Sequence, residues 1–338
     1  MKVQIFLEAG LSPQEVCEIG LVAEGYGVDT VYASAFPARR DPFLNLSKLA
    51  LESSSVRLGV VPLSPFEIVP VRLADSLLTL NDMCGGRAGL VVGGMGQSIM
   101  RATGLKPTRR VTAVRECVEI LREAGKGEPM DYQGEVHRAA GYHPGWTNPE
   151  VPPQVLVGAN GPMMLKMAGQ VADGAMLSDV AIQKMPEVLG NIQTGLATGG
   201  RDLAGFDVSN FFAWHIKEDP QAADDEARRE MVWRGVLQQW YTEPFLGEEQ
   251  AAFVESKFEA FLQAFYQRSA HIEGVPEEII QALVENLTFT GGLDAIPRVV
   301  EHLREFEAAG LDAITLKIHD DPMDAVHLIG KHLIPALN

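Results

Sequence analysis

The chain has 338 residues, 46% of them hydrophobic, and a formal net charge of −17 at pH 7. This acidic balance argues against nucleic acid or an anionic membrane surface as the main partner, and no apolar run reaches the roughly 18 residues that a membrane span needs. The three cysteines have no metal or redox spacing, and the start, MKVQIFLEAG, lacks the apolar region of a signal peptide. We therefore expect a cytoplasmic protein with a small-molecule substrate.

Short apolar runs rich in β-branched residues alternate with amphipathic segments along most of the chain. The apolar runs predict strands over residues 3–7, 28–33, 56–61, 88–92, 154–158, 174–177, 206–216, 288–290 and 313–318. The amphipathic segments predict helices over residues 13–25, 42–52, 71–83, 107–124, 161–169, 185–197, 295–309 and from 323 to the end. Repeated β-then-α units indicate a parallel sheet. About eight of them favour an α/β fold of the closed (β/α)8 barrel type over an open doubly wound sheet.

Two stretches interrupt this alternation. Residues 126–151 hold several Gly, Pro and aromatic residues and predict an irregular excursion. The stretch from about 220 to 285 is too long for one barrel helix, and its aromatic residues at helical spacing indicate a core of their own. We interpret it as a helical insertion before the last strand and helix units. No low-complexity linker is present, so we expect a single domain over residues 1–338.

Glycine-rich segments follow several predicted strands, at the end of a barrel where chemistry takes place. Two such segments are GGMG at 93–96 and GANG at 158–161, and the segment VPLS at 61–64, which has no glycine, follows the strand predicted over residues 56–61. Glycines after a strand let backbone N–H groups approach an anion, and a helix that starts near Pro162 offers free N–H donors to a phosphate. The alternatives need no ligand, because the same glycines also make tight turns and Asn160 can simply cap the helix.

A series of segments, in order along nearly the whole chain, carries a family likeness. The segments are LE at 7–8, RDPF at 40–43, VRLGVVPLSPF at 56–66, GGRAGLVVGGMG at 85–96, KP at 106–107, VPPQVLVGANGPMMLKMAGQVADGAMLS at 151–178, AGLDAITL at 309–316 and LIGKHLIP at 328–335. Together they resemble the bacterial-luciferase-like superfamily, in its branch of coenzyme F420-dependent oxidoreductases, and are similar to the methylenetetrahydromethanopterin reductases. The resemblance implies a barrel, coenzyme F420 or alternatively FMN, hydride transfer with a small organic substrate, and a homodimer.

The resemblance also implies which residues bind the cofactor. They follow the strands: Val61, Pro62, Leu63, Ser64, Gly94, Met95, Gly96, Gly158, Ala159, Asn160, Gly161, Leu177 and Ser178. In the family the cofactor ring rests on a bulge made by a cis peptide, and alignment places that bond at Val61-Pro62. An ordinary trans bond before proline is the alternative. The phosphate and ribityl chain of the cofactor are expected near Asn160, Gly161 and Ser178.

The catalytic candidates implied by the resemblance are Glu8 and Gln97. Glu8 aligns with a carboxylate of the reductases, and such a group can transfer a proton or hold a cationic substrate. Gln97 stands where relatives carry an acid, and an amide there would only orient or polarise. Many relatives have an Asp-His pair where this chain has Ala35 and Phe36. That departure argues against alcohol oxidation by the relatives' mechanism and leaves imine or alkene reduction.

Histidines at two further strand ends have weaker claims. His215 either faces the pocket or is structural, and His319 precedes Asp320 and Asp321, which we interpret as a solvated acid pair. Adjacent strand residues point to opposite faces, so we expect no metal there. The leading function is an F420-dependent oxidoreductase. The alternatives are an FMN-dependent luciferase-like monooxygenase and a non-catalytic binding protein that keeps the barrel.

Overall fold

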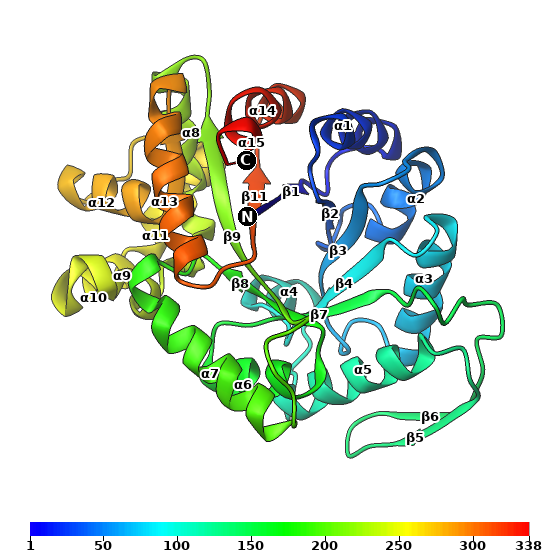
Figure 1. Cartoon of the computed structure of the whole chain (residues 1–338). Coiled ribbons are helices and arrows are strands. Elements are labelled where there is room, and N and C mark those ends of the chain that lie inside the picture. Colours follow the sequence, from blue (N-terminus) through cyan, green and yellow to red (C-terminus); the bar gives the residue numbers. More distant parts are fainter. Residues whose placement is uncertain (338) are drawn as a thin grey trace. The chain divides into compact units, whose positions relative to one another are not determined.

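The computed structural model describes residues 1–337, in which strands and helices alternate along the chain (Figure 1). The chain divides into two compact units. The amino-terminal unit comprises residues 4–176 and 188–209, and the carboxy-terminal unit comprises residues 1–3, 177–187 and 210–337. No helix among residues 1–337 is long and apolar enough to cross a membrane. The single domain expected over residues 1–338 stays a prediction.

The amino-terminal unit is built on a parallel sheet. Its strands pair in the order β1 (Lys2–Leu7), β2 (Thr30–Ser34), β3 (Arg57–Leu63), β4 (Ala88–Val92), β7 (Gln154–Gly158) and β8 (Gly174–Ser178), with β1 belonging to this unit from Gln4 and β8 up to Met176. Most of their residues are buried, as expected for parallel strands covered on both faces. The short apolar runs therefore form strands close to where the sequence predicts them.

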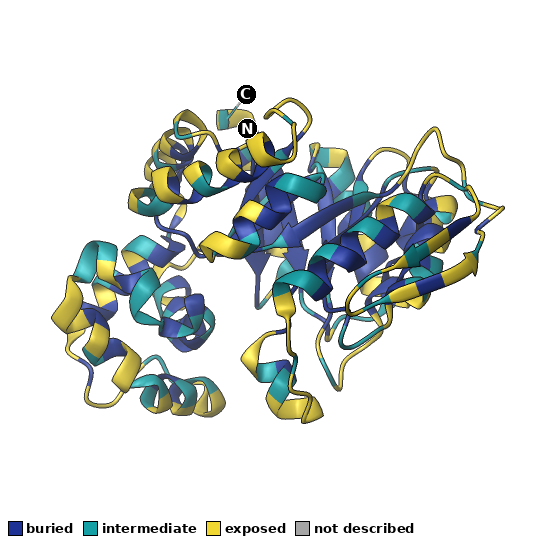
Figure 2. Ribbon diagram, turned by 90° about the horizontal axis from the view of Figure 1, so that it is seen from below, coloured by how far each residue is buried: buried dark blue, intermediate teal, exposed yellow. Residues whose placement is uncertain are grey.

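Helices follow most of these strands and turn a buried face inwards and an exposed face outwards (Figure 2). They are α1 (Pro13–Tyr26), α2 (Pro42–Glu52), α3 (Pro70–Met83), α4 (Gln97–Thr103), α5 (Arg110–Ala124), α6 (Pro162–Val171) and most of α7 (Met185–Thr198). Helix α1 shows the local causes well. Ser12 and Glu15 form a capping box at its start, and Gly27 ends it with φ 85°.

The helix predicted over residues 107–124 is confirmed but starts at Arg110, and a separate helix that the sequence did not predict, α4, precedes it. One prediction in this unit is wrong. The excursion expected to be irregular holds an antiparallel hairpin, β5 (Met130–Gln133) with β6 (Arg138–Tyr142). Its turn is fixed by the buried Glu116 of α5, whose carboxylate accepts hydrogen bonds from the backbone N–H groups of residues 135–137. The two strands are mostly polar, and the acid that fixes their turn lies far away in the sequence. No alternation of hydrophobic residues therefore predicts the hairpin.

The carboxy-terminal unit contains three strands and most of the remaining helices. The strands are β9 (Asp207–Ile216, in this unit from Asn210), β10 (Thr288–Gly291) and β11 (Ala313–Ile318), and β10 pairs with β9 in parallel. The helices outside the insertion are η1 (Ile182–Lys184), η4 (Leu293–Ala295), α13 (Ile296–Ala308), α14 (Pro322–Leu328), the π-helix η5 (Ile329–Leu333) and α15 (Ile334–Leu337).

The predicted insertion is confirmed between β9 and β10. It consists of α8 (Pro220–Glu230), η2 (Met231–Trp233), η3 (Gly235–Leu237), α9 (Gln239–Leu246), α10 (Glu248–Ser256), α11 (Phe258–Gln267) and α12 (Glu277–Leu287). These helices share a hydrophobic cluster in which Phe261 is buried and Trp233, Phe253 and Phe265 pack against it. The aromatic stripe therefore forms a core, as the spacing predicts.

Candidate functional site

The end of β3 carries the predicted bulge. The register between β3 and β4 shifts between Val60 and Leu63, and Pro62 is exposed between two buried neighbours. The carbonyl of Val61 accepts the N–H of Ala35 at 2.9 Å, and the carbonyl of Leu63 accepts the N–H of Gly93 at 2.8 Å. No peptide bond within residues 1–337 is cis. The cis alternative for Val61-Pro62 is therefore wrong, and the bulge forms with a trans bond.

Ser64 fixes the turn that follows the bulge. Its backbone N–H donates to Oε2 of Glu67 at 3.1 Å, and its hydroxyl oxygen accepts the N–H of Phe66 at 3.4 Å. Burial raises the pKa of the Glu67 carboxyl, and the hydrogen bond from Ser64 opposes that rise. Ser64 thus holds the loop in place through local hydrogen bonds while being almost fully buried.

The glycine loop after β4 lies against both neighbouring loops. A Cβ atom added to Gly93 would come within 3.3 Å of Cβ of Pro62, and one added to Gly94 within 3.2 Å of Cε of Met164 in α6. A Cβ atom at either position would require its neighbour to move by a few tenths of an ångström, so the two glycines allow this close approach. Met95 takes a positive φ of 74°. The structure therefore brings the β3 bulge, the glycine loop and the start of α6 together within the amino-terminal unit.

Helix α4 begins directly after the glycine loop. Its N-cap residue is Gly96, which has no side-chain cap hydrogen bond, and Gln97 is the exposed first residue of the helix. The first backbone N–H groups of a helix have no partner inside the helix. The loop and the start of α4 thus present donors on the side where the strands end.

The loop between β7 and α6 leaves the amino end of that helix open. Its N-cap is Gly161, with φ −77° and ψ 148° and no side-chain cap hydrogen bond. Asn160 is not the cap residue, so the alternative that it simply caps the helix is wrong. Ala159 is tied to Met176 by an N–H···O bond of 3.1 Å, and Gly158 packs against Val91. An uncapped start of a ten-residue helix, at the end of a parallel strand, is suited to an anion.

Glu8 follows the last residue of β1 and is half-buried, with its carbonyl accepting the N–H of Leu11 at 3.3 Å. Ala35 and Phe36, which follow β2, both have apolar side chains. Ala35 is buried and Phe36 is 44% exposed. The amino-terminal unit therefore offers Glu8 as an acid at a strand end, and no titratable group at positions 35 and 36.

Leu177 and Ser178 belong to the carboxy-terminal unit. Leu177 is buried, and the Ser178 hydroxyl donates to Oδ2 of Asp179 at 3.0 Å. Asp179 is itself buried, pairs with Arg234 at 3.1 Å and accepts the N–H of Gly235 at 2.9 Å. Burial raises the pKa of the Asp179 carboxyl, and the charge of Arg234 and these hydrogen bonds oppose the rise. Arg234 and Gly235 of the insertion thus fix the side chain of Asp179, the residue after Ser178.

The two strand-end histidines lie in a buried cluster of the same unit. His215 Nδ1 is 2.8 Å from Oε1 of Glu226, and His319 Nδ1 is 3.5 Å from Oε2 of Glu230. The acids expected to be solvated are paired: Asp320 contacts Arg229 at 2.8 Å and Arg268 at 2.7 Å. Sequence reasoning missed Glu226 and Glu230. Their spacing of four along α8 was the available signal, because it places both on one face of a helix.

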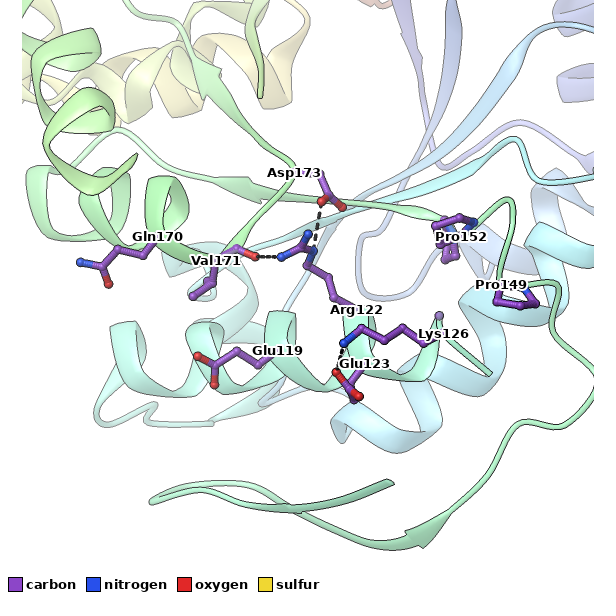
Figure 3. A pocket seen from close by; sticks show the side chains of 11 residues that line it. Glu119, Arg122, Glu123, Lys126, Pro149, Pro152, Gln170, Val171 and Asp173 are labelled. Carbon is purple, nitrogen blue, oxygen red and sulfur yellow. Dashed lines mark hydrogen bonds and ion pairs between the residues drawn. The ribbon is translucent and has the colours of Figure 1, made fainter. Parts of the chain in front are cut away.

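A cavity of about 430 Å³ lies at the other end of the sheet, where β7 and β8 begin (Figure 3). In it Arg122 donates to the carbonyl of Val171 at 2.8 Å and pairs with Asp173 at 3.0 Å, and Lys126 pairs with Glu123 at 2.5 Å (Figure 3). Barrel enzymes carry their chemistry at the carboxyl ends of strands. This cavity is therefore separate from the candidate site. No group of three or more metal-ligating side chains is found among residues 1–337.

These features define an α/β protein of parallel strands in which a bulge, a glycine loop and the uncapped start of α6 come together at the strand ends. The luciferase-like monooxygenase family model matches residues 1–313, and the chain belongs to that family. Two curated relatives are similar. One is the 5,10-methylenetetrahydromethanopterin reductase of Archaeoglobus fulgidus, 26% identical over 94% of this chain and 93% of its own length. The other is the F420-dependent glucose-6-phosphate dehydrogenase of Rhodococcus erythropolis, 27% identical over 64% of this chain and 68% of its own length.

A solved structure confirms the fold class. The coenzyme F420-dependent tetrahydromethanopterin reductase from Methanopyrus kandleri is 21% identical, and the comparison covers 100% of this chain and 99% of that one with a TM-score of 0.87. The predicted (β/α)8 barrel, an α/β fold, is therefore confirmed. The roles of individual residues in the site stay predictions.

Proposed function

We propose that this protein is an oxidoreductase that transfers a hydride between coenzyme F420 and a small organic substrate. The observation that carries the proposal is the open amino end of α6 at Gly161, packed beside a glycine loop and a bulge in the arrangement that a phosphate-bearing ring cofactor needs. The similarity to a methylenetetrahydromethanopterin reductase and to an F420-dependent dehydrogenase supports F420 as that cofactor.

The residues that would hold the cofactor fall into two groups. The backbone at Gly158, Ala159, Asn160 and Gly161 would bind its phosphate, because these residues lead into the uncapped helix. The bulge from Val61 to Ser64 and the loop from Gly94 to Gly96 would support its ring. F420, once bound, supplies a carrier of two electrons that moves as a hydride, and the protein supplies orientation and exclusion of water.

Ser178 is proposed as a cofactor-binding residue together with Leu177. Its hydroxyl donates to Oδ2 of Asp179 at 3.0 Å, and this hydrogen bond fixes the orientation of the side chain. The family resemblance supports the proposal, because it implies that the phosphate and ribityl chain of the cofactor lie near Asn160, Gly161 and Ser178.

Glu8 and Gln97 complete the proposed site. Glu8 is the acid at the end of β1, and it would hold an amine-bearing or cationic substrate or exchange a proton with it. Gln97, at the start of α4, would orient or polarise the substrate, since an amide does not exchange protons usefully near neutral pH. The substrate class that fits a site without the Asp-His pair is an imine, an enone or a pterin.

We further propose that the protein is a homodimer in the cytoplasm, as its relatives' family suggests. Light scattering of the purified protein tests the first part. A mass of twice 36.7 kDa supports the dimer, and a single-chain mass at concentrations used for assay contradicts it.

Titration of the apoprotein with F420 and with FMN, followed by the fluorescence of each cofactor, tests the proposed function. Micromolar binding of F420 with clear preference over FMN supports it. Preference for FMN would move the protein to the monooxygenase function that the family's description names. Binding of neither cofactor would favour the alternative of a non-catalytic binding protein that keeps the barrel.

A further inference from the structure

In the buried cluster around His215, the carboxylate of Glu226 contacts the imidazole of His215 near the end of β9. His215 is the next-to-last residue of β9, and its ring stacks on that of His319, with the centroids 5.1 Å apart and the planes 11° apart. Helix α8 of the insertion contributes Glu226, whose Oε1 lies 2.8 Å from His215 Nδ1. Both residues are almost fully buried. The imidazole is therefore fixed in orientation by the inserted helix.

The hydrogen bonds determine where the proton of His215 sits. Lys217 Nζ lies 2.7 Å from Oε2 of Glu226, while Oε1 of the same side chain faces His215 Nδ1 at 2.8 Å. Carboxylate oxygens accept hydrogen bonds, so His215 Nδ1 carries the hydrogen and donates it. Burial lowers the pKa of His215, Glu226 opposes that effect, and the positive charges of Arg234 and Lys217 lower it further. The ring is then neutral, with a lone pair on Nε2.

That lone pair has no hydrogen-bond partner within residues 1–337, although the atom is buried. A buried polar atom without a partner costs about 1–3 kcal/mol, which is a reason to look for a ligand. His302 shows that such an atom alone is not enough. Its Nε2 is also buried and unpartnered, but it lies in α13, stacked on Phe306 at 4.9 Å. It has no carboxylate behind it and belongs to an aromatic core.

Two features separate His215 from His302. His215 stands at the carboxyl end of a barrel strand, the position from which such folds supply their chemistry. It also has the arrangement of an oriented base: a carboxylate on one ring nitrogen and a free lone pair on the other. The groups that face it are Glu226 from α8, Lys217 just after β9, Arg234 from the insertion and His319 just after β11.

We propose that His215 is an acid–base residue of the reaction and that Glu226 is its positioning residue. The proposal rests on the proposed F420-dependent function. F420, once bound in its reduced form, would supply a hydride and one proton for the reduction of an imine or enone. His215 Nε2 would carry that proton: the N–H bond of the donor would break as the Nε2–H bond forms, and the Nδ1–H would stay donated to Glu226. Nε2 would then pass the proton to the reduced product, and the reverse reaction would run the other way.

The test uses the full-length protein with reduced F420 as the probe. Histidine-selective ¹⁵N NMR is recorded with and without the cofactor, and the His215 signal is assigned by its loss in His215→Gln. We expect the Nδ1–H tautomer in the free protein and a shift of the Nε2 resonance on binding. The matched control is His302, whose resonances should not move. An unchanged His215 Nε2 resonance in a protein that binds reduced F420 overturns the proposal.

A second measurement follows hydride transfer from bound reduced F420 to the quinone menadione between about pH 4.5 and about pH 8, a range that extends below the usual imidazole value because burial lowers the pKa of His215. His215→Gln should slow transfer about 100-fold or more and remove the pH dependence. Glu226→Gln should slow hydride transfer less than His215→Gln does. It should also lower the apparent pKa of the pH–rate profile, because the carboxylate that favours the His215 imidazolium is gone. His302→Gln should match the wild type. A wild-type pH profile in a folded His215→Gln contradicts the proposal, whereas failure of the wild type to bind F420 overturns the proposed function itself.

Discussion

Substitution of Gly161 by aspartate should weaken phosphate binding at the start of α6 without lowering the stability of that helix. A Cβ atom added at Gly161 meets no atom within 4 Å, and its φ of −77° and ψ of 148° suit any L-residue. Aspartate is also a better N-cap than glycine, by a few tenths of a kcal/mol. The free energy of unfolding should therefore stay the same or rise slightly in Gly161→Asp.

Binding of a phosphate should respond in the opposite direction. Two unit charges about 4 Å apart interact by about 1 kcal/mol in water and by about 4 kcal/mol at the effective dielectric constant near a protein surface. Repulsion of this size corresponds to a loss of affinity between about fivefold and about 1,000-fold. The new carboxylate also takes up the N–H groups that would otherwise bind the phosphate. We expect F420 affinity to fall within this range while thermal stability is kept.

The assay is fluorescence titration with F420, alongside thermal unfolding of each variant. Gly161→Ala adds the Cβ atom alone and should bind within about threefold of the wild type, since this side chain meets free space. Gly161→Asn adds a neutral cap of the same size, so the difference between Asn and Asp measures charge and should shrink in high salt. Equal F420 affinity of Gly161→Asp and Gly161→Ala would refute the assignment of the phosphate to α6.

Three further predictions concern other parts of the chain. Glu8→Gln should lower the rate of hydride transfer by about 100-fold or more with little change in F420 affinity, and a wild-type rate would reduce Glu8 to a surface acid. Arg234→Met leaves the buried Asp179 without its ion partner and should cost about 3–5 kcal/mol in chemical denaturation. Adding Asp179→Asn should recover part of that loss, and no recovery would mean that Arg234 acts by packing alone. Although burial acts to raise it, hydrogen bonds from the backbone N–H groups of residues 54–56 hold the pKa of Glu24 at about 2. A lowered pKa adds stability above the unfolded value, so the deficit of Glu24→Gln, about 1–2 kcal/mol at pH 7, should shrink as pH falls from about 4.5 to about 2. A deficit that is the same at pH 7 and at about pH 2 would show that the charge of Glu24 plays no part.

The barrel scaffold could be predicted from the sequence because its signals are local. Each parallel strand is a short run of apolar residues, and each helix repeats apolar residues every three or four positions. Ser12 and Gly27 mark the two ends of α1 through their own hydrogen bonds and backbone angles. Such features need no information from distant parts of the chain, which is why the element boundaries fall close to the predicted ones.

The contacts that organise the site join residues that lie far apart in the chain. The bulge could be expected at Val61-Pro62, but the shift in register between β3 and β4 that forms it depends on a strand about 30 residues further along the chain. Glu116 fixes a hairpin turn 19 to 21 residues away. Arg234 reaches Asp179 across 55 residues. Pairs this far apart in the chain leave no periodic pattern, so only the folded structure reveals them.

The most direct test of the central claim follows the reacting atoms. Reduced F420 that carries deuterium at its transferable position is bound to the protein under labelled dioxygen and offered imines, enones and pterins, with reduced FMN in a parallel series. An F420-dependent oxidoreductase would give a product that has gained one deuterium from F420 and no labelled oxygen. A product that contains labelled oxygen, formed only with reduced FMN, would contradict it and identify a monooxygenase.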